Sequence, residues 1–259
     1  MLLRDRVGIV SGVGPGMGRE IALAFAREGA DVALAARTSP ALDDVAAAVR
    51  ARGRRALCVP TDIATPADCD RLVETTLREL GRIDVLVNNA FRTHPWAPIE
   101  QASFDDWRAI FDVNLFGSLR LTQAVLPHMK AQRRGAIVMI GTMSMRIIEP
   151  NVGGYAASKA ALLAATRTLA REVGPHGIRV NTVVPGYIWS EKMAAYFRSL
   201  AEQQGRSYQA VHAEVSARTA LHHIPEPAEI ADAVVFFASD LSRVVTGQAL
   251  DVNGGHHFH

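Results

Sequence analysis

The sequence predicts an α/β fold in which a mostly parallel sheet carries helices on both faces. Short apolar runs alternate with amphipathic helical segments along the 259 residues. The apolar runs are nearly uninterrupted, which is typical of strands that are covered on both sides. A glycine-rich stretch, Ser11-Gly-Val-Gly-Pro-Gly-Met-Gly18, separates the first run from the first helical segment. Together these features predict a Rossmann-type, doubly wound sheet of seven strands in a single domain over residues 1–259.

Each expected element follows from its own local pattern. Short apolar runs place strands at residues 6–10, 32–36, 56–60, 85–87, 135–140, 178–184 and 249–252. Amphipathic periodicity places helices at residues 17–28, 41–52, 67–80, 104–130, 154–173 and 228–238. Gly29, Gly81 and Gly174 each close the helix that precedes them. Residues 189–221 are the least regular part, and we expect them to form one or two mobile helices that act as a lid.

Composition and charge exclude several classes of protein. Hydrophobic residues make up 49% of the chain, which is enough for a large core. The 28 Lys and Arg residues nearly balance the 26 Asp and Glu residues, so nucleic acid is not an expected partner. The sequence has neither an apolar leader nor a run of about 18 apolar residues, so we expect a cytoplasmic protein with no membrane segment.

The cysteines and histidines do not predict a metal site. Cys58 and Cys69 lack metal-ligand spacing, and we expect two free thiols in a reducing compartment. His222 and His223 are neighbours whose side chains point apart, which favours a role in a loop. The terminal Gly-Gly-His-His-Phe-His is expected to be a solvated or interface tail.

The glycine-rich stretch has the setting of a phosphate-binding turn. It follows an apolar strand and opens a helix at Met17. Gly12, Gly16 and Gly18 would let the backbone approach a pyrophosphate, while the helix N-terminus supplies amides and a favourable dipole. The alternative is a glycine-rich turn without a ligand.

Two residues at strand ends bear on the choice of nucleotide. The end of the second strand, Ala35-Ala36-Arg37-Thr38-Ser39, offers no carboxylate for a ribose 2′-hydroxyl. Arg37 suits a 2′-phosphate, so NADP(H) is favoured and NAD(H) is the alternative. Asp62, after the third strand, either accepts from the adenine amino group or caps the turn before the next helix.

Tyr155-Ala-Ala-Ser-Lys159 places a phenol and an ammonium one helical turn apart, on the same helix face. A nearby ammonium favours the phenolate, which makes tyrosine a usable proton donor and acceptor near neutral pH. Combined with the upstream glycine-rich turn, this pair indicates redox chemistry.

These motifs together resemble the short-chain dehydrogenase/reductase family over nearly the whole chain. The motifs that carry the resemblance are Ser11–Gly18, Asn88-Asn89-Ala90, Asn114, Tyr155 with Lys159, and Pro185-Gly186. Ser11 stands where the family usually has threonine, and Phe91 replaces a glycine. Thr142, thirteen residues before Tyr155, replaces the family's serine and keeps a hydroxyl. Ser144 is its rival.

The resemblance implies a catalytic set of Asn114, Thr142, Tyr155 and Lys159. Tyr155 would exchange the proton, and Thr142 would hold the substrate oxygen. Lys159 would lower the pKa of Tyr155 and bind the ribose, while Asn114 would hold a water that connects Lys159 to solvent. The implied cofactor contacts are Ser11, Gly12, Gly16, Met17, Gly18, Arg37, Asp62, Ile63, Asn89, Ala90, Tyr155, Lys159, Pro185, Gly186, Ile188 and Ser190.

The substrate side is less defined. Trp96, Trp189, Met193 and Phe197 suggest a substrate with substantial apolar surface. The alternative is that these side chains only pack the lid on the body or on a neighbouring subunit. The family usually assembles as tetramers, so the resemblance implies a homo-tetramer or homo-dimer.

The expected activity is interconversion of a carbonyl and a secondary alcohol by hydride transfer with NADP(H) or NAD(H). A cofactor-binding sensor without turnover is an alternative, which the departures at Phe91 and Thr142 keep open. A lyase or epimerase that uses bound cofactor is another, and it would form product with no net change in the nicotinamide.

Overall fold

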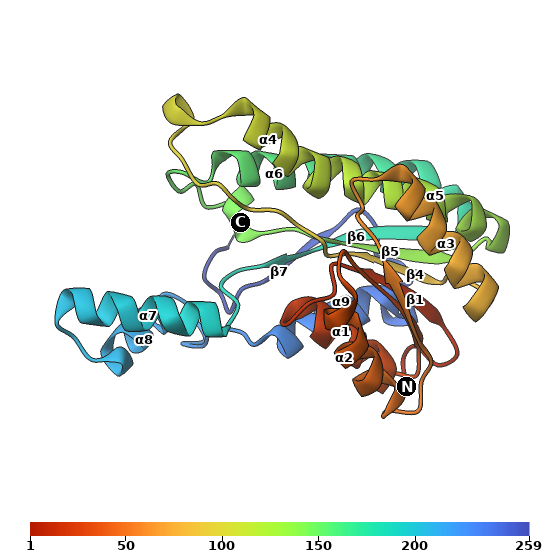
Figure 1. The fold of residues 1–259 in the computed structure, drawn as a ribbon, viewed down its shortest axis with the longest axis horizontal. Helices are drawn as coiled ribbons and strands as arrows, with labels where there is room; N and C mark the ends of the chain where they lie inside the picture. Colours follow the sequence, from red (N-terminus) through yellow and green to blue (C-terminus); the bar gives the residue numbers. More distant parts are fainter. Residues whose placement is uncertain (259) are drawn as a thin grey trace.

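The computed structural model describes residues 1–258, and these form the predicted α/β architecture. Within them, seven parallel strands make one sheet in the order β3-β2-β1-β4-β5-β6-β7 (Figure 1). The strands are β1 (Val7–Ser11), β2 (Asp31–Ala36), β3 (Ala56–Pro60), β4 (Val85–Asn88), β5 (Gly135–Ile140), β6 (Ile178–Pro185) and β7 (Ala249–Val252). The predicted strands are confirmed to within one residue at each end, and β1, β4 and β6 each end one residue later than predicted.

Helices cover both faces of the sheet, as the continuous burial of the strands requires. On one face lie α1 (Met17–Arg27), α2 (Ser39–Arg50) and α9 (Pro227–Ala238). On the other lie α3 (Pro66–Leu80), α5 (Ser118–Gln132) and α6 (Gly153–Val173), with α4 (Phe104–Phe111) against α6 (Figure 1). Each layer buries its own apolar cluster against the sheet. None of the helices in residues 1–258 is long and apolar enough to cross a membrane.

The direction of winding reverses at β1, which lies between β2 and β4. In sheets of this kind, ligands bind outside the carboxyl ends of the strands at such a switch point. The predicted motifs at residues 11–18, 88–90 and 142 follow the ends of β1, β4 and β5. The fold therefore brings them to one edge of the sheet.

The prediction of one continuous helix over residues 104–130 is wrong in one respect. A π-helical turn over Asp112–Gly117 separates α4 from α5. Gly117 lies so close to Ile63 that a Cβ would come within 2.8 Å of its side chain. The helix also ends later than expected, at Gln132. Wide turns of this type are often found at functional sites.

The end of α6 also differs from the simplest expectation. Gly174 does follow the helix, but its φ is −52°, and the chain continues through a 3₁₀ turn over Gly174–His176. The left-handed residue is Gly177, with φ of 72°. Glycine is needed there because a Cβ would collide with the carbonyl of Arg133.

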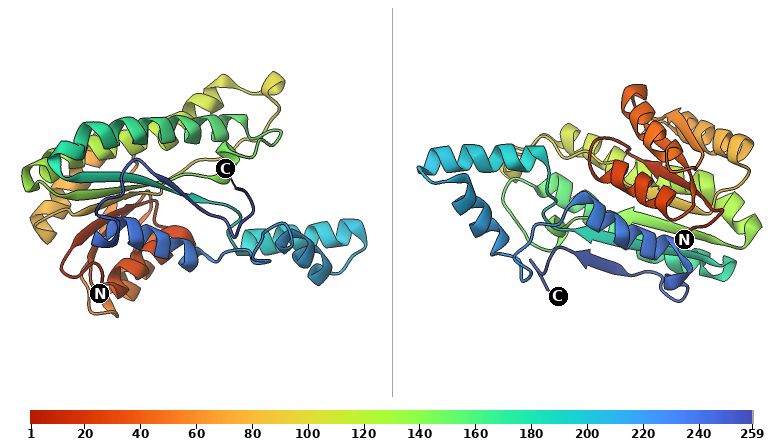
Figure 2. Two further views of the ribbon diagram at one scale, coloured as in Figure 1. Left: turned by 180° about the vertical axis from the view of Figure 1, so that it is seen from behind. Right: turned by 90° about the horizontal axis from the view of Figure 1, so that it is seen from below.

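The segment expected to form one or two helices forms two, α7 (Glu191–Gln204) and α8 (Tyr208–Ser216). They project from the body of the molecule beyond β6 (Figures 1 and 2). A small cluster of their own, with Phe197, Ala201, Val211 and Val215 at its centre, holds the two helices together.

Candidate active site

The glycine-rich turn connects β1 to α1 at the carboxyl edge of the sheet. Gly12 has φ of 77°, and a Cβ there would come within 2.5 Å of the Ala90 backbone. A Cβ on Gly18 would collide with the carbonyl of Gly12. Gly16 has φ of 123° and open space around the position of a Cβ. The turn is therefore tight on its inner side and open above the N-terminus of α1, which is an arrangement that accepts a phosphate.

Polar side chains fasten this turn to the end of β4. The hydroxyl of Ser11 donates to the Val87 carbonyl at 3.2 Å and accepts from the amide of Asn89 at 3.3 Å. Asn89 in turn donates from Nδ2 to the carbonyl of Gly12 at 2.8 Å. Its Oδ1 is buried without a hydrogen-bond partner among the described residues. Such an atom is rare in a folded interior, and it suits a ligand that brings a donor. Phe91 is 57% exposed, so the side chain in the glycine position is accommodated at the surface.

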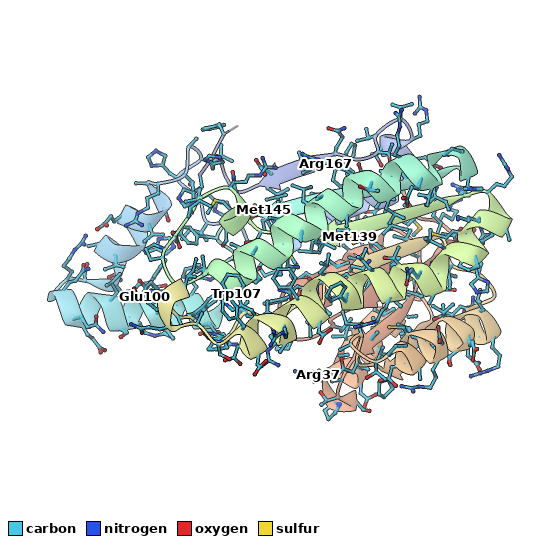
Figure 3. The ribbon with its side chains drawn as sticks, turned by 90° about the horizontal axis from the view of Figure 1, so that it is seen from above. Arg37, Glu100, Trp107, Met139, Met145 and Arg167 are labelled. Atoms are coloured by element: carbon cyan, nitrogen blue, oxygen red, sulfur yellow. The ribbon has the colours of Figure 1, made fainter. Side chains whose placement is uncertain are left out.

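The residues expected at the nucleoside end lie at the same edge. Arg37 follows β2 and is exposed, beside the N-terminal elements (labelled in Figure 3). It forms no ion pair within residues 1–258. The Asp62 carboxylate accepts from the amide of Ala64 at 2.9 Å. It therefore caps the turn before α3, which was one of its two expected roles. Ile63 is 4% exposed and packs on Gly117.

Tyr155 and Thr142 meet across the gap between α6 and the end of β5. The Thr142 side chain lies close enough to the Tyr155 phenol to act on its pKa. Its hydroxyl donates to Ser144 Oγ at 3.3 Å and accepts from the amide of Ser144 at 3.2 Å. Thr142 is therefore the hydroxyl beside the tyrosine, and it is linked to Ser144.

The electrostatics of this pair differ from the sequence-based expectation. Burial raises the pKa of Tyr155 above its usual value, and the Thr142 side chain opposes that shift. Lys159 is 2% exposed, and burial lowers its pKa to about 8. Its Nζ donates to the Ile140 carbonyl at 2.7 Å. The Lys159 ammonium is turned toward β5, and Thr142 is the side chain that opposes the rise in the pKa of Tyr155.

Asn114 lies in the π-helical turn and is fully buried. Its Oδ1 accepts from the amide of Arg92 at 2.7 Å, and its Nδ2 donates to the Arg92 carbonyl and to Ser158 Oγ, both at 2.9 Å. Ser158 also donates to the Tyr155 carbonyl at 2.7 Å. Asn114 therefore braces the loop after β4 against the helix that carries the tyrosine. The sequence analysis missed Ser158, which lies beside Lys159 in the same motif.

The chain after β6 passes the other side of the site. Gly186 allows close contact with β7, because a Cβ there would come within 2.7 Å of Asn253. Ile188 packs on the core, and the Ser190 hydroxyl caps α7 by accepting from Met193 N at 3.2 Å. The tail was expected to be solvated or at an interface, but His256 stacks on Tyr187 with ring centroids 4.9 Å apart.

The four aromatic and aliphatic residues expected near the substrate lie in two places. Trp96 packs edge-on against Tyr155, with ring centroids 5.9 Å apart, and both line a small hollow with Trp107 (labelled in Figure 3). Phe197 is 2% exposed and fills the cluster of the α7–α8 segment, where Trp189 and Met193 also pack. Trp96 is therefore the member that reaches the tyrosine, and the other three pack within the α7–α8 segment.

Known proteins resemble this chain along its whole length. A family model described as enoyl-(acyl carrier protein) reductase matches residues 12–257. The short-chain reductase protein NovJ of Streptomyces niveus is 35% identical over 254 residues, which cover 97% of this chain and 94% of the relative. Cis-4-hydroxycyclohexanecarboxylate dehydrogenase of Sinomonas cyclohexanicum is 34% identical over 252 residues, covering 97% and 96%.

Solved structures agree with the sequence relatives. Carveol dehydrogenase from Mycobacterium avium, in complex with NAD, superposes with a TM-score of 0.91 at 28% identity and covers 98% of each chain. NAD⁺-bound xylitol dehydrogenase superposes with a TM-score of 0.89 at 29% identity, covering 98% of this chain and all of the other. The chain therefore belongs to the short-chain dehydrogenase/reductase family of oxidoreductases.

Proposed function

We propose that the protein interconverts a carbonyl and a secondary alcohol, with Tyr155 as the general acid and base. The observation that carries this proposal is the pair of Tyr155 and Thr142, whose side chains lie beside one another, with buried Lys159 one turn along α6. The pair lies at the same sheet edge as the open glycine turn. A proton donor, a second hydroxyl and a nucleotide cradle at one edge are the parts that such a reaction needs.

The residues present fit a nicotinamide dinucleotide. The open space above Gly16 and the unpartnered Oδ1 of Asn89 are the features of this chain that such a ligand would use. The pyrophosphate would lie on the turn from Ser11 to Gly18, and Pro185, Gly186, Ile188 and Ser190 would border the nicotinamide. When bound, the cofactor supplies or accepts the hydride.

Arg37 supports a preference for NADP(H), since it is exposed, lies just beyond β2 and has no ion-pair partner in the described part of the chain. NAD(H) is the alternative, and two related structures are described as NAD complexes. Fluorescence titrations with NADPH and NADH should show tighter NADPH binding, and Arg37→Ala should weaken NADPH alone by at least about tenfold. Equal loss for both nucleotides, or no loss, would exclude the phosphate role.

In the reductive direction Tyr155 donates its phenolic proton to the substrate oxygen. Its raised pKa keeps the phenol protonated at neutral pH, which is the form that this step requires. The Thr142 hydroxyl hydrogen-bonds the same oxygen and fixes its position. Lys159 would hold the ribose hydroxyls. Asn114 holds the loop after β4 against α6. Protons would return to Tyr155 between this loop and this helix.

The substrate would meet Trp96, which borders Tyr155 and favours apolar surface on the ligand. The names of the relatives mention carveol, xylitol and a hydroxycyclohexanecarboxylate. A screening panel should therefore include cyclic terpenoid ketones, keto sugars and 4-oxocyclohexanecarboxylate.

Turnover on this panel, followed by nicotinamide absorbance, tests the proposal directly. Tyr155→Phe should lower turnover at least about 100-fold while leaving the affinity for the nucleotide within a fewfold. Tight nucleotide binding with no turnover on any panel member would favour the sensor alternative. Product formed without net change in the nicotinamide would favour a lyase or epimerase.

We further propose a homo-dimer or homo-tetramer in the cytoplasm. Exposed Phe104 and Phe116 lie on the α4–α5 side of the molecule and supply apolar surface for a neighbouring subunit. The two free cysteines, Cys58 and Cys69, suit a reducing compartment. Light scattering and cell fractionation test these two points.

A further inference from the structure

A largely enclosed ion pair joins the turn after Thr142 to the last strand of the sheet. Nη2 of Arg146 lies 3.0 Å from Oδ1 of Asp251, and the two side chains are only 13% and 14% exposed. Their mutual burial sets them apart from the exposed ion pairs on the helices, such as Arg108–Asp105, where both side chains are at least 75% exposed. An ion pair this enclosed responds strongly to geometry, because solvent screens it little.

One short turn links Arg146 to the Thr142 hydroxyl. The amides of Arg146 and Ile147 donate to the Met143 carbonyl at 2.8 and 3.0 Å. The 3₁₀ turn over Met143–Met145, whose last residue is labelled in Figure 3, is capped by the Thr142 side chain. Displacing Arg146 would therefore displace the turn that Thr142 begins.

Asp251 anchors the other end of the pair to a regular strand. It lies in β7 opposite Val184 of β6, one residue before Pro185. The β6–β7 pairing also fixes the chain that passes the site after Pro185. The ion pair therefore ties the loop bearing Thr142 to the opposite wall of the active site.

We propose that Arg146 is a positioning residue, whose ion pair with Asp251 holds the Thr142 hydroxyl against the Tyr155 phenol. The inference rests on the roles proposed above for Thr142 and Tyr155. Buried ion pairs contribute little net stability compared with apolar replacements, and fixing one arrangement of the chain is their best-supported use.

The test measures the tyrosine itself, without substrate or cofactor. The phenol of Tyr155 is titrated by ultraviolet difference absorbance in the apo protein, and the Tyr155→Phe form of each variant subtracts the other tyrosines. Circular dichroism at each pH checks that the protein stays folded. The main variant is Arg146→Met with Asp251→Leu, since losing one partner alone would leave a buried unpaired charge. Arg27→Gln with Asp232→Asn removes an exposed ion pair between α1 and α9 as the control.

Because Thr142 lowers the pKa of Tyr155, moving Thr142 away from the phenol should raise that pKa. The Arg146/Asp251 double variant should shift the titration upward by the same amount as Thr142→Val. Adding Thr142→Val to the double variant should give no further shift, and the control should match the wild type. Arg146→Lys, which keeps the charge, should recover most of the wild-type value.

An unchanged titration in the double variant, alongside a shift in Thr142→Val, would overturn the proposal. Additive shifts, or no shift in Thr142→Val, would overturn it as well. Absence of turnover on every substrate would count against the proposed function alone, because the titration does not depend on turnover. Where turnover is found, kcat should fall about tenfold in the double variant, with the KM for the nucleotide unchanged.

Discussion

Lys159 carries a stability cost that one substitution should remove. Burial disfavours its ammonium and lowers its pKa from 10.5 to about 8. That difference corresponds to about 3 kcal/mol, at about 1.4 kcal/mol per pKa unit. Lys159→Met keeps a side chain of similar length without the charge. It loses the hydrogen bond to the Ile140 carbonyl, worth about 1 kcal/mol. The apo variant should therefore be more stable than the wild type by about 2 kcal/mol at pH 7.

The sign of the pH dependence follows from proton binding. Between pH 8 and 10.5 the unfolded chain holds a proton on Lys159 that the folded protein has released. Stability of the wild type therefore rises with pH across this interval through this group. The cost is complete below about pH 8 and disappears above about pH 10.5. The advantage of Lys159→Met should shrink accordingly as the pH rises.

Urea unfolding at pH 7 and at about pH 10.5 measures both effects. Lys192→Met, at an exposed position on α7, is the matched control and should change the free energy of unfolding little at either pH. A Lys159→Met protein that is less stable at pH 7 would refute the reasoning. So would a stability difference that is the same at both pH values.

Three further outcomes are expected. Thr142→Val should lower kcat about 10- to 100-fold with little change in nucleotide affinity, measured by steady-state kinetics and fluorescence titration; unchanged kcat would assign the substrate oxygen to Ser144. Gly18→Ala should weaken NADPH binding by at least about tenfold in calorimetry, because a Cβ collides with the Gly12 carbonyl and opens the turn; wild-type affinity would contradict this. Asn114→Ala should lower the free energy of unfolding by about 2–3 kcal/mol, because the backbone amide and carbonyl of Arg92 both lose their partner in the fully buried Asn114 side chain; a loss below about 0.5 kcal/mol would show that the loop is held elsewhere.

The sequence predicted most of the fold because its signals are local. Apolar runs and helical periodicity locate the strands and helices, and their alternation implies the parallel sheet. The π-helical turn at Asp112–Gly117 was not predicted, because the amphipathic pattern resumes on both sides of it and a single extra residue shifts its phase only once.

The candidate site could be predicted where a motif is contiguous in sequence, as for Tyr155 with Lys159 and for the glycine turn. Contacts between distant segments could not be predicted. Arg146 meets Asp251 more than 100 residues away, and His256 stacks on Tyr187, although no spacing rule joins either pair. The pKa of Tyr155 was expected to fall beside Lys159, but it rises, because burial depends on tertiary packing rather than on spacing along a helix.

The wide turn that holds Asn114 has a consequence for how this fold changes over evolution. A π-helical turn accommodates one residue more than an α-helical turn. Deleting Val113 would remove the extra residue and allow α4 and α5 to merge into one regular helix, which would lack the widened backbone that now presents Asn114. A single codon loss could thus turn Asn114 away from Arg92 and Ser158 without removing a strand or a helix. On the roles proposed above, such a deletion offers a short route from an oxidoreductase to a nucleotide-binding protein that keeps the same scaffold.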